Sequence, residues 1–330
     1  MNIILTLDYE LFLGKNTGSI DNCLIRPLDA YIESIEKYGA KFTIFVDATY
    51  LYRLKDYSTK YEKAAEDYKK ISTHIKNLQQ RGHEIQLHIH PHWFYSDYNG
   101  QEWNMDQTHY KLCDLPLEEA EKIFSSSKAL LDSIIGSATT AFRAGGFSTQ
   151  PTEILKQLFE QNEIKADTSV CPGNIYDSPQ QKYDYLRVPV VDKYMFSNDI
   201  CLEDPQGKYI EIPITTYKIS PLFYWKLACN RLLKLNRHRI WGDGEAVVTT
   251  AESIKVRLTR YTQAMACIDG YKISYLKDIY KFQKKRNREI LCVLGHPKLA
   301  TNYSVIKLEE FCKYATSDGA KFLTISQCYE

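Results

Sequence analysis

The sequence lacks several features that would assign it to a specialised class of protein. Its nine cysteines are odd in number and scattered, and none forms a Cys-x-x-Cys pair. This argues against a disulfide framework or a thiolate zinc site and predicts a reducing compartment. No apolar run approaches the roughly 20 residues that a membrane span needs, and no basic segment precedes Asp8 as it would in a signal peptide. We therefore expect a cytoplasmic protein.

The sequence also has no large excess of positive or negative charge. The 42 Lys and Arg residues nearly balance the 41 Asp and Glu residues, so the net charge is +1 and gives no reason to expect nucleic acid as a partner. What the 330 residues do offer is 44% hydrophobic content and a high aromatic load of 25 Tyr, 13 Phe and 4 Trp. Aromatic faces suit both a core and a sugar ligand.

Short apolar runs alternate with helical patterns, which predicts parallel strands joined by right-handed crossovers. The fold expected is α/β, a distorted barrel of seven or eight β/α units in a single domain 1–330, with residues 171–250 as an irregular elaboration within it. Strands are predicted at 2–7, 41–46, 84–88, 140–143, 164–168, 186–191, 209–215, 290–295 and 321–325, and helices at 27–38, 61–80, 117–135, 151–161, 222–235, 251–268, 274–286 and 307–316.

Polar residues recur where these strands end. In a parallel barrel all such ends open on one face, where active sites are built. Asp47 is interpreted as the cap of the following helix. The other strand-end residues are candidates for chemistry: Asp8, Glu10, His88, Arg143, Asp167 and His296.

The segment GHEIQLHIHPHW, residues 82–93, holds four of the eight histidines. His88 and His92 are four apart, so one helical turn would put both on one face, as two ligands of one ion require. A His-rich surface loop is the alternative. In LTLDYE, Asp8 and Glu10 are two apart and point the same way on a strand, so one can bind a metal while the other acts as a base. Glu10 is the predicted ligand, and Asp8 the fallback.

Three further segments supply candidate site residues. Arg143 in AFRAGG is a candidate for orienting a carboxylate or binding substrate, and an ordinary surface arginine is the alternative. Gly145 and Gly146, which follow it, allow the backbone to approach a ligand closely. His296 in VLGHPK follows a buried strand and is a candidate acid–base group. The aromatic residues beside the histidines, above all Trp93, are candidates for sugar stacking or for the core; the others are Phe94, Tyr95 and Trp103.

With these residues in hand, the chain resembles the polysaccharide deacetylases of the NodB-homology group, carbohydrate esterase family 4. LTLDYE, KFTIFV, GHEIQLHIHPH, AFRAGG, VLGHPK and KFLTIS resemble that family's strands and motifs in order, and the resemblance spans almost the whole chain. It implies a NodB-type barrel with Asp8 as base, Glu10, His88 and His92 as metal ligands, Arg143 orienting Asp8, and His296 as general acid. Trp93, Gly145, Gly146 and Asp167 are the predicted substrate-binding residues.

Two departures from the family pattern bear on these assignments. Tyr9 stands where most members carry the metal-binding aspartate, which moves that role to Glu10. Gly145 and Gly146 replace the usual Pro-Tyr after the arginine, so the substrate can differ from chitin or peptidoglycan. The resemblance is greatest to variants of O-antigen and surface-polysaccharide biosynthesis.

The function expected is metal-dependent hydrolysis of an acetyl or formyl group from an amino sugar, with one divalent ion, zinc for a set of two imidazoles and a carboxylate. The alternatives are an amidase acting on a small non-sugar amide and an inactive glycan-binding relative. A cytoplasmic site favours a nucleotide- or lipid-linked sugar as substrate. Residues 221–241 carry five basic and no acidic residues, which is typical of a helix lying on an anionic membrane surface or of a covering helix with a solvated face. An oligomer is compatible with the sequence.

Overall fold

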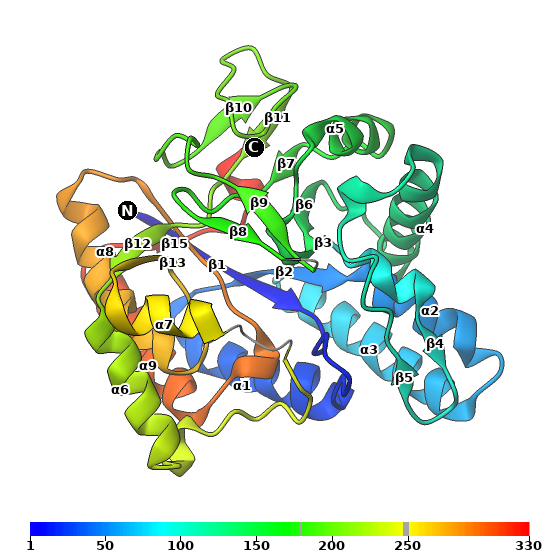
Figure 1. Ribbon diagram of the computed structural model, residues 1–330, viewed down its shortest axis with the longest axis horizontal. Helices are drawn as coiled ribbons and strands as arrows, with labels where there is room; N and C mark the ends of the chain where they lie inside the picture. The colour runs from blue at the N-terminus through cyan, green and yellow to red at the C-terminus, as the bar shows by residue number, and fades with distance from the viewer. Residues whose placement is uncertain (179, 247–250, 330) are drawn as a thin grey trace.

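The computed structural model describes residues 1–178, 180–246 and 251–329 (Figure 1). Its strands are β1 (Asn2–Tyr9), β2 (Phe42–Asp47), β3 (Glu84–Ile89), β4 (Asp97–Tyr98), β5 (Trp103–Asn104), β6 (Ala141–Ala144), β7 (Ala166–Asp167), β8 (Ile175–Asp177), β9 (Lys182–Asp184), β10 (Tyr194–Phe196), β11 (Tyr209–Glu211), β12 (Thr216–Ile219), β13 (Thr262–Met265), β14 (Ile290–Val293) and β15 (Lys321–Phe322). Its α-helices are α1 (Arg26–Ile35), α2 (Ala48–Ser58), α3 (Glu62–Gln80), α4 (Leu117–Ile135), α5 (Thr152–Gln161), α6 (Pro221–Leu232), α7 (Ala251–Thr259), α8 (Leu276–Lys285) and α9 (Asn302–Ser317).

One large sheet organises the molecule. Its strand order is β10-β11-β7-β6-β3-β2-β1-β14, with β15 also paired to β1, and every pair in it is parallel except β10 with β11. The sheet curls strongly into a half-barrel (Figure 1). The predicted class, an α/β fold of the distorted-barrel type, is therefore confirmed.

The two ends of this sheet approach each other through residues that follow β11 and β13. Thr215 N donates to Cys292 O at 3.0 Å, and Cys267 forms an isolated parallel bridge with Leu294. The curl therefore brings the carboxyl ends of β1, β3, β6 and β14 around a common centre, although they are spread along the strand order.

Helices cover the outer face of the sheet. Contacts join α1 to α9, and join α2, α3, α4 and α5 in succession. With helices outside and side chains filling the curl, β2 is buried at all six positions, which is why its sequence, FTIFVD, is apolar almost throughout instead of alternating. Among the described residues, no helix combines the length and apolarity needed to cross a lipid bilayer.

Most predicted elements are present, and α4 has the predicted bounds. The acidic residues Glu118 and Glu119 occupy its first turn, and Gly136 ends it at φ +72°, a left-handed conformation that glycine adopts without strain. Two predictions were wrong. The helix at 251–268 ends at Thr259 because residues from Thr262 pair with β12, and 186–191 form no strand.

The predicted elaboration, residues 171–250, contributes β8 to β12 and α6. Two of its strands, β10 and β11, extend the main sheet beyond β7, whereas β8 and β9 form a separate hairpin. The last four residues of this predicted segment, 247–250, lie outside the described residues.

Candidate active site

The end of β1 places two carboxylates on the same side. Asp8 and Glu10 are separated by one residue in extended backbone, so their side chains point in one direction while Tyr9 points in the other. Asp8 N donates to Gly295 O at 2.9 Å, which ties this point of β1 to the segment after β14. A Cβ at Gly295 would lie 2.4 Å from the side chain of Ile268, so only glycine lets the backbone at position 295 pack this close to Ile268.

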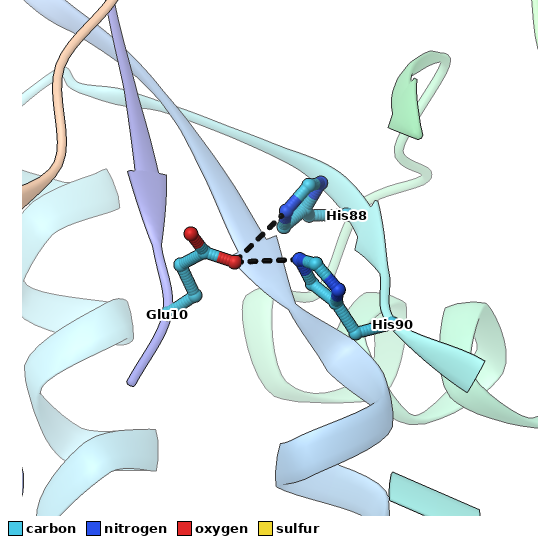
Figure 2. A group of neighbouring side chains, drawn as sticks. All are labelled: Glu10, His88 and His90. Atoms are coloured by element: carbon cyan, nitrogen blue, oxygen red, sulfur yellow. Dashed lines mark hydrogen bonds and ion pairs between the residues drawn. The ribbon is translucent and has the colours of Figure 1, made fainter. Parts of the chain in front are cut away.

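The end of β3 places two histidines opposite Glu10. His88 lies in the strand and His90 just beyond it, still in extended backbone at φ −119° and ψ 93°. Their rings therefore turn to the same side. Glu10 Oε2 lies 3.4 Å from His88 Nε2 and 2.6 Å from His90 Nε2 (Figure 2). One ligand atom from each of the three residues lies within 4.8 Å of the others, and all three residues are buried.

This group fits a divalent metal ion. Two imidazoles and a carboxylate are a donor set of catalytic zinc sites, and donors bound to one ion at about 2.1 Å lie roughly 3.4 Å apart. His88 Nδ1 lies 2.7 Å from Arg143 O, to which it donates, so its Nε2 faces Glu10. A histidine ligand is commonly held by such a carbonyl. The Glu10/His88/His90 group could therefore hold a metal ion.

The protonation of the group follows from its burial and charges. Burial raises the pKa of Glu10, but Lys298 and the histidines outweigh it and hold that pKa well below its usual range. Burial lowers the pKa of His88, but Asp8 and Glu10 together raise it to about 9. A carboxylate that stays ionised against the cost of burial is suited to bind a cation, which would take the place of the histidine proton.

Lys298 is a further member of the site. Its Nζ lies 2.9 Å from Glu10 Oε1 and 2.6 Å from Leu11 O, and its side chain is 8% exposed. Because Lys298 holds Oε1, the other oxygen, Oε2, is the one that faces the histidines. The lysine thus fixes the orientation of Glu10 as well as compensating its charge.

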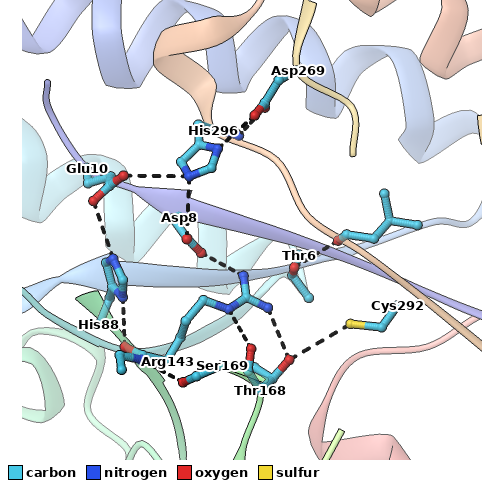
Figure 3. Close-up of polar contacts among 12 residues, drawn as sticks. Thr6, Asp8, Glu10, His88, Arg143, Thr168, Ser169, Asp269, Cys292 and His296 are labelled. Carbon is cyan, nitrogen blue, oxygen red and sulfur yellow. Dashed lines mark hydrogen bonds and ion pairs between the residues drawn. The ribbon is translucent and has the colours of Figure 1, made fainter. Parts of the chain in front are cut away.

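A buried ion pair joins Asp8 to Arg143. Arg143 Nη1 donates to Asp8 Oδ1 at 2.6 Å, and Arg143 Nε donates to Thr168 O at 3.0 Å (Figure 3). The guanidinium also lies over the ring of Phe45, 4.3 Å from its centre, and has no exposed surface. Removing one partner would leave a charge buried without compensation. Asp8 Oδ1 is thereby engaged, while Oδ2 points toward His296.

His296 closes the site from β14. Its Nδ1 lies 2.9 Å from Asp269 Oδ2, and its Nε2 lies 3.6 Å from both Asp8 Oδ2 and Glu10 Oε1 (Figure 3). Burial lowers the pKa of His296, but Asp269 outweighs it, so that the pKa is raised above 6.5. The His296 side chain is 15% exposed, against 7% for Glu10 and 2% for Asp8, so the site is reached from the His296 side.

His92 is not one of the three clustered residues, although the sequence analysis assigned it as a ligand. It lies in a short 3-10 helix, Pro91–Tyr95, where its ring contacts those of His90, Trp93 and Tyr110. Neither ring nitrogen has a hydrogen-bond partner, and burial lowers its pKa well below 6.5. His90 takes its place beside Glu10 because the backbone stays extended through His90, so the period is two and not four.

Trp93 lies in the aromatic core and not on a sugar-binding surface. It is fully buried, its Nε1 donates to Asp47 Oδ2 at 2.7 Å, and its ring packs against Tyr50 and Trp103. Asp47 also accepts a bond from Tyr50 N at 3.1 Å and so caps α2, the role expected for it. Trp93 therefore supports the histidine segment from behind, with no ring face open to a ligand.

The two predicted glycines also have structural neighbours. A Cβ at Gly145 would lie 2.5 Å from Ile89 O and 2.7 Å from His90 Nδ1, so the group that approaches closely is His90 itself. Gly146 has φ +59°, and its carbonyl accepts a bond from Gln181 Nε2 at 2.8 Å. The two glycines thus leave room for His90 and allow the turn that follows β6. A contact of either glycine with substrate stays a prediction.

Asp167 is fully buried below Arg143. Its carboxylate accepts bonds from Ser169 N at 2.7 Å and Ser169 Oγ at 3.0 Å, and its register partner on β11 is Glu211. Burial raises the pKa of Asp167 to about 6 and raises that of Glu211 well above its usual range. Burial thus favours the protonated form of both carboxyl groups. A substrate contact of Asp167 stays a prediction.

Sequence reasoning missed His90, Lys298 and Asp269. His90 had a usable signal, because the spacing rule applied to Asp8 and Glu10 also pairs it with His88. Lys298 directly follows the GHP segment, but nothing in the sequence indicates that its side chain turns back to Glu10. Asp269 lies 27 residues before His296, so only the fold brings them together.

Neither protein-family models nor curated protein sequences match this chain. Solved structures of similar fold include one described as a polysaccharide deacetylase from Mycobacterium smegmatis, with TM-score 0.53, 12% identity and coverage of 99% of this chain and 88% of the other. PuuE allantoinase gives TM-score 0.51, 13% identity and coverage of 99% and 88%. A GH57 branching enzyme from Thermococcus kodakaraensis gives 0.53, 11% and coverage of 99% and 70%. At these identities the similarity establishes the fold, which polysaccharide deacetylases share with other enzymes.

Proposed function

We propose that the protein is a metal-dependent hydrolase that removes an acetyl or formyl group from the nitrogen of an amino sugar. The observation that carries this proposal is the buried Glu10/His88/His90 group, with the Asp8–Arg143 pair on one side and the His296–Asp269 pair on the other. A metal site flanked by one oriented carboxylate and one oriented imidazole supplies what amide hydrolysis requires.

Glu10, His88 and His90 are the residues that would hold the ion. When bound, a divalent ion supplies a Lewis acid that polarises a carbonyl and makes water more acidic. Zinc suits this donor set. Lys298 holds the free oxygen of Glu10, and Arg143 O holds the far nitrogen of His88, so both ligands are oriented before an ion arrives.

Asp8 is the proposed general base. Arg143 engages Oδ1 and fixes the plane of the carboxylate, which leaves Oδ2 to accept the proton of an attacking water. The guanidinium is itself fixed by Thr168, so Asp8 has little freedom to turn away.

His296 is the proposed general acid. Asp269 accepts the Nδ1–H bond and stabilises the charged ring, which leaves Nε2–H directed into the site, where it can protonate the leaving amine. Asp269 raises the pKa of His296 above its usual value, which favours the protonated ring. Acid and base are then held by different partners, so each can keep its own protonation state.

The substrate class rests on the similarity of fold to the deacetylase from Mycobacterium smegmatis and on the motif resemblance. For a cytoplasmic enzyme the substrate would be a nucleotide- or lipid-linked amino sugar in polysaccharide or lipopolysaccharide biosynthesis. The similar fold of PuuE allantoinase keeps an amidase acting on a small non-sugar amide as the second candidate. An inactive glycan-binding protein is the third, and the complete set of acid, base and ligand residues argues against it.

The test is release of acetate or formate from N-acetyl and N-formyl amino sugars, free and nucleotide-linked, with allantoin as the non-sugar amide. The full chain is assayed as purified, after chelation and after re-addition of zinc. We expect release from at least one amino sugar, loss on chelation and recovery with zinc. Hydrolysis of allantoin alone would favour the second candidate, and sugar binding without release would favour the third.

Glu10→Ala is the matched variant. Removing the carboxylate should abolish both stoichiometric metal binding and hydrolysis. A Glu10→Ala protein that retained both would contradict the ligand assignment, whatever the substrate.

A further inference from the structure

Helix α6 turns apolar side chains toward solvent. Leu222, Trp225 and Leu232 are 60%, 53% and 81% exposed, and Cys229 is exposed as well. Spacings of three, four and three residues place these four on one stripe of the helix. The opposite side carries Phe223, which is fully buried against the rings of Tyr271 and Tyr275. The helix is thus anchored by one face and leaves its apolar stripe uncovered.

The uncovered apolar surface continues past α6. Trp225 Nε1 donates to Leu258 O at 3.1 Å, so α7 lies beside α6 (Figure 1). More than half of the exposed large apolar side chains in the described residues lie in this one stretch of 40 residues. We define the α6–α7 face by these residues: Leu222, Trp225, Leu232, Leu233, Leu235, Ile240, Ile254, Val256 and Tyr261. Exposed apolar residues gathered in this way mark an interaction surface.

The charge beside this face is mainly positive: residues 212–261 include nine Lys and Arg against three acidic residues, Asp243, Glu245 and Glu252. Between Glu211 and Asp243 the sequence has no acidic residue but carries Lys218, Lys226, Arg231, Lys234, Arg237 and Arg239. The whole chain is almost neutral, so the surplus is local. Four of these cations are exposed next to the apolar stripe or just after it: Lys226, Lys234, Arg237 and Arg239. The complementary surface must therefore be anionic and must also accept leucine and tryptophan.

We propose that the α6–α7 face binds the surface of a lipid bilayer that contains anionic lipid. A helix with leucine and tryptophan on one side and lysine and arginine beside them lies in the plane of such an interface, where its apolar side chains enter the acyl boundary and its cations meet the headgroups. Tryptophan favours this depth, and each cation adds to the attraction. The proposal concerns binding alone and does not depend on the proposed hydrolysis.

The segment after α6 connects this face to the active-site loops. Trp241 N donates to Ala300 O at 2.9 Å, close to His296 in the sequence. The carboxylate of Asp243 accepts bonds from Ser19 N and Ser19 Oγ, both at 2.7 Å, in the loop that follows Glu10. Docking of the α6–α7 face would therefore hold both active-site loops near the bilayer.

The test is co-sedimentation of the full chain with vesicles of phosphatidylcholine alone and of phosphatidylcholine with 30% phosphatidylglycerol. We expect binding at least tenfold tighter to the anionic vesicles, and weakening with added salt because part of the attraction is electrostatic. Reversal of the four exposed cations (Lys226→Glu, Lys234→Glu, Arg237→Glu and Arg239→Glu) should weaken binding at least 100-fold. Leu222→Ser with Trp225→Ser and Leu232→Ser should do the same with the cations intact.

The matched control reverses four exposed lysines on α2, α3 and the turn between them, with the same change of net charge: Lys55→Glu, Lys60→Glu, Lys69→Glu and Lys76→Glu. It should reduce binding less than threefold, and circular dichroism should show every variant folded. No binding of the unaltered protein to anionic vesicles, or equal loss in the control, would overturn the proposal. Concentration-dependent dimerisation that the serine variant abolishes, without vesicle binding, would instead assign the face to a second copy of this chain.

Discussion

The carboxyl ends of the strands and the α6–α7 face differ in how their charged side chains are compensated. At the strand ends three buried pairs hold opposite charges at hydrogen-bond distance: Arg143 on Asp8, Lys298 on Glu10, Asp269 on His296. On the α6–α7 face the cations are exposed and have no acidic residue between Glu211 and Asp243 to meet them. Charge is compensated within the chain at the strand ends, whereas the surplus of exposed cations at the face favours compensation by an anionic surface outside the chain.

This difference predicts how substitutions divide between the two regions. A change at the strand ends leaves a buried charge unpaired and should alter catalysis, metal binding or folding stability. A change on the α6–α7 face should leave all three nearly unchanged, because exposed charges contribute little to stability.

The largest effect is expected for Asp8→Asn. The amide keeps the size of the side chain and an oxygen for Arg143, but it cannot accept a proton from water. We expect kcat to fall by about 10³-fold, within the range for loss of a general base, with metal binding preserved. Lys226→Glu, on the α6–α7 face, should leave kcat on a soluble amino sugar within twofold. If Asp8→Asn kept the kcat of the unaltered protein, Asp8 would not be the general base.

Lys298→Met should destabilise the metal-free protein. Without the lysine, the buried Glu10 carboxylate loses its main compensating cation, and we expect the free energy of unfolding to fall by about 3 kcal/mol. The measurement is urea unfolding in excess chelator. The control is Lys37→Met, which removes an exposed ion pair with Glu309 and should cost less than about 1 kcal/mol. Equal losses of unfolding free energy in the two variants would show that Lys298 contributes no more to stability than an exposed ion pair does.

His90→Gln and His92→Gln separate the two possible ligand sets. His90 Nε2 lies 2.6 Å from Glu10 Oε2, whereas His92 contacts the ring of His90 but is not one of the three clustered residues. Titration of the chelated protein with zinc should show affinity weakened more than about 100-fold in His90→Gln, beyond the range typical of outer residues, and less than about 10-fold in His92→Gln. The reverse result would restore the set predicted from sequence.

Whether a feature of this site can be predicted from sequence depends on how far apart in the chain the interacting residues lie. The parallel fold, the strand ends and the direction of Asp8 and Glu10 follow from local periodicity, which needs no partner. His92 was chosen over His90 because a helical period was applied to residues that the structure leaves extended up to Pro91. Continuing the strand period by two residues places His90, and not His92, beside Glu10 and His88, as the structure does.

Other features could not be read because their causes are distant in the chain. Lys298 reaches Glu10 across 288 positions, and Asp269 meets His296 only after β13 turns back on β12. That same pairing converts the end of a predicted helix at 251–268 into a strand, an outcome that tertiary contacts decide over local propensity. For Trp93 the sequence left sugar stacking and the core as alternatives, and only the fold, which encloses it with Tyr50 and Trp103, decides for the core.

The smallest effect concerns Asp167 and Glu211, two buried carboxyl groups that are register partners on β7 and β11. Burial raises the pKa of Asp167 to about 6 and that of Glu211 further, so the folded state keeps a proton that the unfolded chain releases. The free energy of unfolding should therefore fall as pH rises from about 4.5 through 6, by at most about 1.4 kcal/mol per pH unit for one proton.

Glu211→Gln cannot ionise and its amide can donate to Asp167, so its stability should exceed that of the unaltered protein increasingly from pH 5 to 7. Urea unfolding at pH 5, 6 and 7 measures the difference, with Glu160→Gln, which removes an exposed ion pair with Lys208, as the control expected to give a curve parallel to the unaltered protein. A parallel curve for Glu211→Gln as well would mean that the pair is ionised, and that burial at the strand ends tolerates a charge without a partner.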